Sequence, residues 1–345
     1  MRFSHSSLST ILQCPMTYYL SKIQGIHKIV PATALHLGSA VHHGLAENVI
    51  ELDDIYDEYC QEQAIAEGIL SAYFDQKSSI YSQILNNDRF VTEEHELHLE
   101  ANLPSASFHG FIDLLVITDH GATIVDYKTT SREPNWDDYT DQLLRYTYLC
   151  QENGINVDKI AILNLRKIGI RQKQSESDIM FYNRIKSTYQ DLPAQYVIYH
   201  EFDKDLLSQS YMDRYIYNLD IMCQEATKII ETKNYYINYA EANGKYRSEY
   251  YEIFYNMPDA EVLYEIEDTI PGIEEPKRQC VPIDMKTIEY TDQPDIIINK
   301  YDIYATKRRL YNNDNTFHNW LTSNFITDDS LLAVYDSAYI NAQKS

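Results

Sequence analysis

Long apolar segments are missing from this 345-residue chain. No run of about 18 apolar residues occurs, so no membrane span is expected. Residues 1–7 lack an apolar core, so no signal peptide is expected. Glycine and proline number only 10 each, which excludes collagen-like and Pro/Gly-rich sequence. Hydrophobic residues make up 44% of the chain, which excludes a mainly disordered protein and leaves one large globular domain or two smaller ones.

Cysteine is also scarce. The five cysteines are widely scattered and form no C-x-x-C pair; they are Cys14, Cys60, Cys150, Cys223 and Cys280. An odd number of cysteines without close spacing is typical of reduced thiols rather than of a disulfide framework. We therefore expect a cytoplasmic protein.

Basic residues are in the minority, with 29 Lys and Arg against 52 Asp and Glu, for a net charge of −23. This balance argues against non-specific nucleic-acid binding by the whole surface, but it leaves room for a local basic groove. Residues 159–174 contain no acid and five bases: Lys159, Arg166, Lys167, Arg171 and Lys173. Most runs of this kind are solvated faces.

Hydrophobic periodicity predicts an α/β arrangement. The first 80 residues are expected to be mostly helical, with a longer helix over 38–50. A period of two then predicts strands from residue 95, over 108–118 and over 123–129. A helix over 137–152 and a buried strand over 159–166 follow. Further on, the pattern predicts a strand over 195–202, a helix over 203–233 and helical structure over 301–342, while 258–300 stays unassigned.

Three charged side chains are expected to converge on the predicted hairpin. If His120-Gly121 forms a two-residue turn, Asp113 lies directly opposite Lys128 and diagonally from Asp126. Such neighbours lie roughly 5–8 Å apart. A register slip of one residue would move Asp113 to the other face of the sheet.

The surroundings of these residues favour a metal site. Asp113 and Asp126 stand within apolar runs, where a carboxylate is costly unless it is paired or bound to a metal. Oxygen ligands favour Mg²⁺ or Mn²⁺ over zinc, and a lysine beside them suits metal-assisted phosphodiester hydrolysis. The alternative, which these three residues alone leave open, is a structural Asp–Lys–Asp ion cluster.

Further motifs carry a family resemblance. Gln142 and Tyr146 are four apart, hence on one face of the predicted helix. With them, the chain resembles the PD-(D/E)XK nuclease superfamily, specifically its RecB/AddB-like branch, over roughly residues 1–235. The matching pieces occur in family order: the Ser6-Ser7-Leu8 opening with Cys14-Pro15 and Tyr18, Gly38-x-x-x-His42, Gly110-Phe111-Ile112-Asp113, Asp126-Tyr127-Lys128-Thr129, and Gln142-x-x-x-Tyr146.

The resemblance implies a restriction-endonuclease-like αβββαβ core, with a mixed central sheet flanked by helices, in a nuclease domain over residues 1–235. Residues 236–345 would form a mostly helical C-terminal extension packed on this core, with a role that the sequence does not give.

The resemblance also implies roles for individual residues. The metal ligands would be His42, Asp113, Asp126 and the backbone carbonyl of Tyr127. Lys128 would be the catalytic lysine, and Gln142 and Tyr146 would position the DNA strand and the surroundings of Lys128.

For two of the expected metal ligands, a neighbouring residue of the same type is an alternative. Glu96 or Glu100 is expected to reach a second metal position, with Glu96 favoured. His43 competes with His42, but the spacing from Gly38 selects His42. Phosphate contacts are expected from the basic segment that follows the predicted strand, namely from Arg166, Lys167, Arg171 and Lys173.

The sequence also predicts that an iron–sulfur cluster and a motor domain are absent. Many RecB-type nucleases hold an iron–sulfur cluster on a Cys-Pro cysteine and three closely spaced C-terminal ones. Cys14-Pro15 is present here without such a triplet, so no iron–sulfur cluster is expected and Cys14 is interpreted as a buried apolar residue. No Walker motif occurs, so any motor would be a separate partner such as a helicase.

The sequence thus predicts a Mg²⁺- or Mn²⁺-dependent DNA nuclease, with an exonuclease acting on ends or single strands favoured. The expected setting is phage, mobile-element or bacterial DNA recombination, replication or repair. The expected location is the cytoplasm of a bacterial or phage-infected host cell, with DNA and a helicase, annealing or replication protein as partners. The alternatives are a structure- or sequence-specific endonuclease of the same fold and a non-catalytic DNA-binding subunit with a relict site.

Overall fold

The computed structural model describes residues 1–28, 33–56, 60–244, 248–255, 264–268 and 279–282. The chain divides into two compact units. The first unit comprises Met1–Leu8 and Pro31–Thr227, and the second comprises Ser9–Val30 and Lys228–Ser345. Helix α1 (His5–Gln13) therefore contributes to both.

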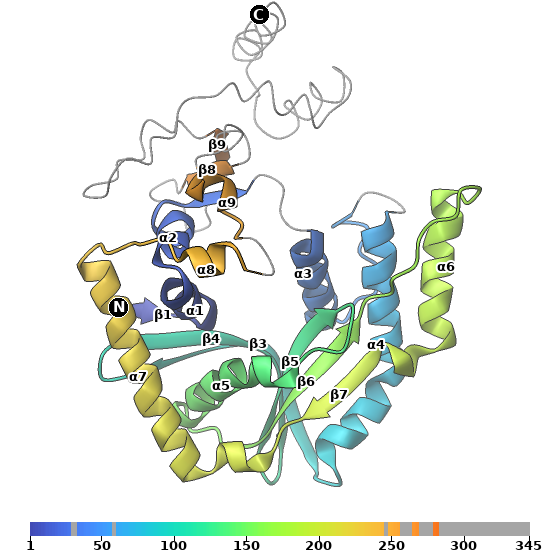
Figure 1. The fold of residues 1–345 in the computed structure, drawn as a ribbon. Helices are drawn as coiled ribbons and strands as arrows, with labels where there is room; N and C mark the ends of the chain where they lie inside the picture. Colours follow the sequence, from blue (N-terminus) through green and yellow to red (C-terminus); the bar gives the residue numbers. More distant parts are fainter. Residues whose placement is uncertain (29–32, 57–59, 245–247, 256–263, 269–278, 283–345) are drawn as a thin grey trace, which may run out of the picture. The chain divides into compact units, whose positions relative to one another are not determined.

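The first unit is built on a mixed sheet (Figure 1). Among the described residues this sheet has six strands in the order β1-β4-β5-β6-β7, with β3 paired to β4. Strands β5 and β6 are parallel, as are β1 and β4, and the remaining pairs are antiparallel. The strands are β1 (Arg2–Phe3), β3 (Phe90–Asn102), β4 (Ser107–Thr118), β5 (Ala122–Thr130), β6 (Val157–Arg166) and β7 (Val197–Glu201).

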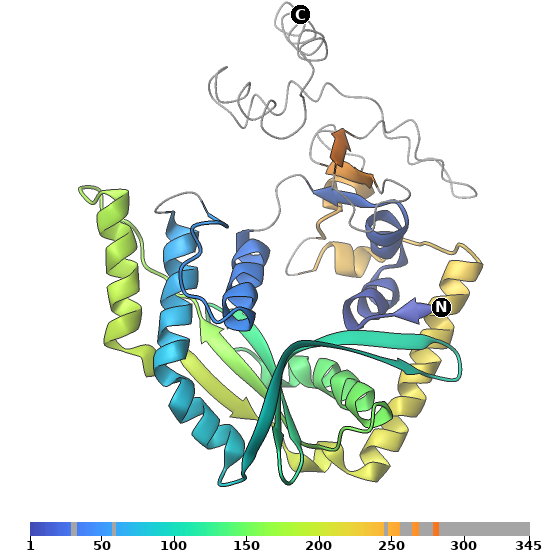
Figure 2. The same ribbon diagram turned by 180° about the vertical axis from the view of Figure 1, so that it is seen from behind.

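Helices cover both faces of the central strands, as Figures 1 and 2 show. Helices α3 (Thr33–Ala46), α4 (Gln61–Leu85) and α6 (Asp178–Asp191) lie on one side. Helices α5 (Thr140–Glu152) and α7 (Gln209–Glu231) lie on the other. The two-sided cover explains why β5 and β6 are buried along most of their length.

Local signals set several helix ends. The Cys60 side chain accepts a hydrogen bond from the Gln63 N–H at the start of α4, and Asn86 ends that helix in the left-handed conformation with φ of 45°. Ser177 caps α6 by accepting from the Met180 N–H. The segment predicted as a helix over 203–233 begins with a 3₁₀ turn, Lys204–Leu207, so α7 begins only at Gln209.

The main core of the first unit lies between the sheet and the helices α3, α4 and α6. Val41 and Leu70 from the helices meet Val116, Tyr127 and Leu163 from the strands, all almost fully buried. The predicted order of helix, three strands, helix and strand corresponds to α3, β3, β4, β5, α5 and β6, with α4 inserted between α3 and β3. The helix predicted over 38–50 instead ends at Ala46.

The register of the β4–β5 hairpin differs from the prediction. The N–H of Thr118 donates to the carbonyl of Gly121 at 2.8 Å, so Asp119 and His120 form the two-residue turn. Leu114 then pairs with Val125, and the same register places Asp113 opposite Asp126 rather than opposite Lys128. The shift is two residues, so every side chain keeps its predicted face.

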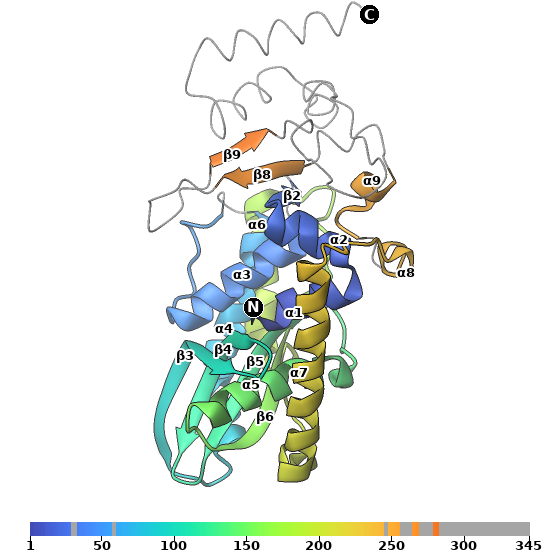
Figure 3. The same ribbon diagram turned by 90° about the vertical axis from the view of Figure 1, so that its left-hand side faces the viewer.

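The second unit has its own small core. Strands β2 (Ile26–Lys28), β8 (Tyr264–Asp268) and β9 (Gln279–Pro282) lie side by side and pair antiparallel (Figure 3). The short helices are α2 (Pro15–Tyr18), the π-helix Tyr19–Ile23, α8 (Tyr239–Ala242) and α9 (Tyr251–Phe254). The Tyr250 hydroxyl donates to the Ile26 carbonyl at 2.6 Å, which ties the N-terminal segment to the later one.

Cys14 is buried in this second core beside Met16 and Phe254, as predicted. The segment predicted to be helical over 301–342 lies outside the described residues. The packing of residues 236–345 on the nuclease core stays a prediction. None of the helices in the described ranges combines the length and the apolar character that a membrane crossing needs.

Candidate metal-binding and catalytic site

The site lies where β4 and β5 separate. The two strands pair only from Leu114 to Ile117, and β4 pairs with β1 at Ser107 and Phe108. Asp113 occupies the point of separation, where its Oδ2 accepts a 2.6 Å hydrogen bond from the Tyr127 N–H. The Asp113 carboxylate thus accepts a main-chain hydrogen bond from β5 at the point where the backbones of β4 and β5 no longer pair. Asp113 is buried.

His42 reaches this point from α3. Its Nδ1 lies 3.5 Å from Asp113 Oδ1 and 3.9 Å from Glu96 Oε1. Its Nε2 lies 3.2 Å from the Tyr127 carbonyl oxygen. Ligand atoms of His42, Glu96 and Asp113 all lie within 4.8 Å of one another, a spacing that one metal ion can bridge. We call these three residues the β3–β4 cluster.

The carboxylates perturb the imidazole. Burial lowers the pKa of His42, but the hydrogen bond to Asp113 and the charges of Asp113, Asp126 and Glu96 outweigh it, so the pKa lies above the usual value. The metal-free site thus favours a proton on His42 at the place where a cation would bind.

Glu96 lies opposite Asp113 in the β3–β4 register, between the pairs His95–Leu114 and Leu97–Ile112. Its φ is +48°, an uncommon value for a residue other than glycine within a strand. Burial and then the charge of Asp113 raise the pKa of its carboxyl. Glu100 lies elsewhere, paired with Arg2 and with the His98 Nε2 at 3.6 Å. The structure therefore brings Glu96, and not Glu100, to His42.

Asp126 is the most deeply buried carboxylate of the site, with 1% of its side chain exposed. Its Oδ2 lies 2.6 Å from Lys128 Nζ, a charge-assisted contact, whereas its Oδ1 has no partner among the described residues. Burial, followed by the charge of Asp113, raises its pKa to about 7. A buried carboxylate with one unpaired oxygen fits a bound cation, and the oxygen-rich donor set fits Mg²⁺ or Mn²⁺.

Helix α5 orients the lysine. Lys128 Nζ donates to Gln142 Oε1 at 2.9 Å, and Gln142 Nε2 donates to the Tyr146 hydroxyl at 2.8 Å. The two α5 residues stand one turn apart, so they present both groups to the same strand. The Lys128 ammonium also lies 5.4 Å from the centre of the Tyr139 ring. These contacts hold Lys128 beside Asp126.

The basic segment begins near the same end of the sheet. Arg166 pairs with Thr130 across β5 and β6, two residues beyond the pairing of Lys128 with Asn164. Arg166 and Lys167 are half-buried, whereas Arg171 and Lys173 are exposed. Burial lowers the pKa of Lys167.

Asn164 is a polar residue that sequence reasoning missed. It is fully buried beside Lys128, and its Oδ1 accepts from the Thr130 hydroxyl at 2.7 Å. Its Nδ2 has no partner among the described residues. The signal was present in the sequence, because Asn164 interrupts the apolar run from Ile160 to Leu165.

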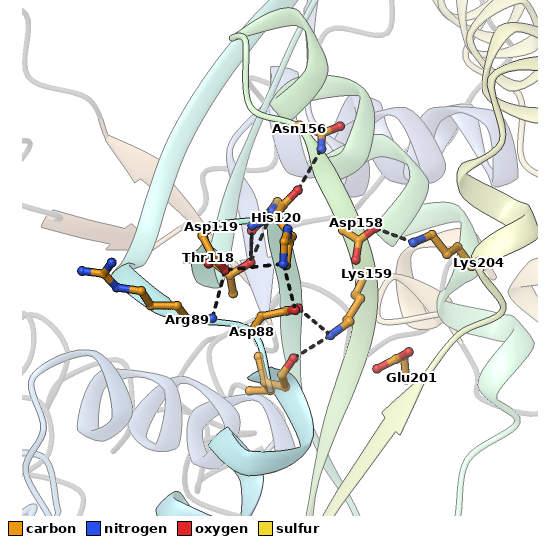
Figure 4. Close-up of polar contacts among 12 residues, drawn as sticks. Asp88, Arg89, Thr118, Asp119, His120, Asn156, Asp158, Lys159, Glu201 and Lys204 are labelled. Carbon is orange, nitrogen blue, oxygen red and sulfur yellow. Dashed lines mark hydrogen bonds and ion pairs between the residues drawn. The ribbon is translucent and has the colours of Figure 1, made fainter. Parts of the chain in front are cut away.

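A second acidic cluster lies at the turn of the β4–β5 hairpin (Figure 4). It contains Asp88, Asp119 and His120, and we call it the turn cluster. Lys159 Nζ lies 3.6 Å from Asp88 Oδ2 and donates to the Ile84 carbonyl at 2.9 Å. Asp119 Oδ1 accepts from the Arg89 N–H at 2.9 Å, so these acids already have partners. We interpret the turn cluster as structural.

Comparison with known proteins decides the family. A family model described as "PD-(D/E)XK nuclease superfamily" matches residues 2–196, more than half of the chain. The chain belongs to the PD-(D/E)XK nuclease superfamily. The predicted restriction-endonuclease-like fold is thereby confirmed, and PD-(D/E)XK nucleases use divalent metals. A search of curated proteins found no significant match.

Solved structures of similar proteins include one described as "Putative exonuclease" from Eubacterium rectale. It is 13% identical, with a TM-score of 0.44, and the match covers 67% of this chain and 80% of that one. The protein SSO0001 is 13% identical, with a TM-score of 0.25 and coverage of 55% and 76%. VC1899 from Vibrio cholerae is 12% identical, with a TM-score of 0.21 and coverage of 52% and 61%.

Proposed function

We propose that this PD-(D/E)XK nuclease is a Mg²⁺- or Mn²⁺-dependent deoxyribonuclease of the RecB/AddB-like branch, acting as an exonuclease on DNA ends or single strands. The observation that carries the proposal is the convergence of His42, Glu96, Asp113 and the Tyr127 carbonyl beside Asp126 and Lys128. Bacterial or phage DNA recombination, replication or repair, with a helicase, annealing or replication partner, is the setting that we propose.

Each side chain has a role in this proposal. The β3–β4 cluster, Asp126 and the Tyr127 carbonyl would hold the divalent ion, which when bound activates a water for attack on phosphorus and stabilises the leaving oxygen. Lys128 would place its ammonium at the scissile phosphate and offset the negative charge that develops there. Gln142 fixes the Lys128 Nζ through a 2.9 Å hydrogen bond, and Tyr146 fixes Gln142 in turn.

Arg166, Lys167, Arg171 and Lys173 would contact phosphates of the bound strand, because Arg166 ends the strand beside Lys128 and the other three follow it in the chain. A short basic segment on a protein of net charge −23 would confine DNA to one groove.

The test is cleavage of end-labelled linear single- and double-stranded DNA, with covalently closed circles alongside, in Mn²⁺, Mg²⁺ or EDTA. The variant is Lys128→Ala, and the control is Lys204→Ala, which removes an exposed lysine paired with Asp158. We expect metal-dependent loss of linear DNA by the wild type and the control, and none by Lys128→Ala.

The products separate the alternatives. Mononucleotides or short oligomers from linear DNA support an exonuclease, and nicked or linearised circles would show an endonuclease instead. DNA binding without cleavage of any substrate, and without uptake of Mn²⁺ in calorimetry, would contradict the enzyme and favour a non-catalytic subunit.

A further inference from the structure

Two exposed aromatic side chains lie two residues along β3 and β4 from the proposed ligands Glu96 and Asp113. Phe111 of β4 stands directly opposite His98 of β3, and their ring centres lie 4.6 Å apart with an interplanar angle of 31°. Half of the Phe111 surface is exposed (50%), although its neighbours Gly110 and Ile112 are buried. We call Phe111 and His98 the aromatic pair.

The aromatic pair continues both strands that carry the β3–β4 cluster. Phe111 is two residues from Asp113, and His98 is two residues from Glu96, which corresponds to roughly 7 Å along each strand. A Cβ added to Gly110 would lie 3.0 Å from the Tyr146 ring of α5. Gly110 therefore faces α5, and the adjacent Phe111 points away from that helix.

The charges beside the pair do not favour a phosphate. The His98 Nε2 lies 3.6 Å from Glu100 Oε1, whose charge Arg2 offsets, and Glu96 adds a second carboxylate on the same strand. Carboxylates repel a phosphate backbone, whereas an aromatic face attracts the uncharged face of a base. A strand that crosses this surface would therefore present its base to Phe111 and its phosphate to the cation site.

We propose that Phe111, supported by His98, stacks one unpaired base next to the scissile phosphodiester. The inference rests on the proposed nuclease function and narrows its substrate to single-stranded DNA or an unpaired end. Within a duplex, neighbouring base pairs occupy both faces of each internal base, so only an unpaired or terminal base offers a free face. Stacking accepts any base, because every base has a π-face.

The test measures binding of a single-stranded oligonucleotide by fluorescence anisotropy in Ca²⁺. A second oligonucleotide of the same length carries a tract of abasic sites. The variant is Phe111→Ala, and the matched control is Phe90→Ala, which removes another exposed phenylalanine on the same strand pair, opposite Thr118 near the turn. Phe111→Trp keeps an aromatic face.

We expect Phe111→Ala to raise the Kd for the normal strand about ten-fold, while Phe90→Ala and Phe111→Trp remain near the wild type. On the abasic strand, the wild type and Phe111→Ala should have equal Kd values. The proposal would be overturned if the ratio of the Phe111→Ala Kd to the wild-type Kd were the same on both strands. A general structural defect would weaken binding whether or not the strand carries bases.

Failure of the stacking proposal and failure of the nuclease proposal can be told apart. A wild type that cleaves DNA but shows no base-dependent effect of Phe111→Ala overturns stacking alone. A wild type that binds single strands in a base-dependent manner but cleaves nothing with Mn²⁺ overturns the nuclease alone. A wild type that binds no single strand overturns the stacking proposal directly.

Discussion

The backbone N–H of Tyr127 donates a 2.6 Å hydrogen bond to Oδ2 of Asp113. This contact joins β4 to β5 at the point where their main chains part, and it leaves Oδ1 of Asp113 toward His42 at 3.5 Å. One carboxylate therefore both links β4 to β5 and faces the proposed cation site. A change that keeps the acceptor but removes the charge separates these two tasks.

Asp113→Asn is that change, because an amide oxygen can still accept from the Tyr127 N–H. We expect the folded structure to remain and the cleavage rate to fall by about 10²–10³-fold or more, since a charged ligand is lost from the electrostatic centre of the reaction. Cleavage rates together with circular dichroism check this. Asp119→Asn in the turn cluster is the matched control and should cleave like the wild type. Equal activity of Asp113→Asn and the wild type would remove Asp113 from the metal site.

Asp126→Asn should stabilise the metal-free protein. The folded-state pKa of about 7 lies above the ordinary value of 3.8, so at pH 8 the folded state holds a charge that its surroundings disfavour. We expect the variant to unfold about 2–4 °C higher in EDTA, for a gain of about 1 kcal/mol. The wild type should regain stability with Mn²⁺, and the variant should gain less. A lower unfolding temperature of the variant in EDTA would contradict the interpretation that the charge of Asp126 destabilises the metal-free protein.

Gln142→Leu should affect the position of Lys128 rather than the metal. It removes the 2.9 Å acceptor of the Lys128 ammonium and the partner of the Tyr146 hydroxyl. We expect cleavage about 10–100-fold slower, as for other residues that orient a ligand or catalytic group. Mn²⁺ affinity in calorimetry should stay close to that of the wild type. A large loss of Mn²⁺ affinity would show that Gln142 acts through the metal ligands instead.

The buried contacts of Glu67 on α4 predict an acid-sensitive contribution to stability. Glu67 is buried, and its carboxylate accepts from Lys186 at 2.8 Å, from the Tyr182 hydroxyl and from the Leu52 N–H at 3.1 Å. Burial raises its pKa, but these donors outweigh burial and lower the pKa below the usual 4.5. The folded state thus stays ionised where the unfolded state takes up a proton, so the stabilisation is present above about pH 4.5 and is lost as the pH falls.

Glu67→Gln should therefore reduce the free energy of unfolding at pH 7 by about 2–4 kcal/mol, because Lys186 loses its partner in a largely buried network. Urea unfolding at pH 7 and at pH 4 measures the effect, and the difference between wild type and variant should shrink at pH 4. Glu225→Gln, on α7, provides an exposed control. A difference that grows toward pH 4 would contradict the lowered pKa.

The family, the order of the elements and the groups that meet at the site could be predicted from sequence. The resemblance of five ordered motifs implied the family and the site residues, and local spacing placed Asp126 and Lys128 on one strand face and Gln142 and Tyr146 on one helix face. The hairpin register was wrong by two residues, because it depends on which residues form the turn, and Asp119-His120 and His120-Gly121 are similar in sequence signal.

Other features depend on tertiary structure and left no local signal. The pairing of β3 with β4 sets Glu96, rather than Glu100, opposite Asp113 and close to His42, and the sequence of β3 alone does not give that register. The association of Ser9–Val30 with the later segment is equally non-local, as the hydrogen bond from Tyr250 to Ile26 illustrates. Sequence patterns report faces and periods, whereas these contacts join residues far apart in the chain.

The most direct measurement is a crystal of the wild type grown or soaked with Mn²⁺, with the anomalous scattering of manganese recorded. The account predicts a peak bounded by His42, Glu96, Asp113 and the Tyr127 carbonyl, within reach of Asp126, and its loss in Asp113→Asn. A manganese peak at Asp88, Asp119 and His120 with none beside His42 would contradict the account and move the metal chemistry to the hairpin turn.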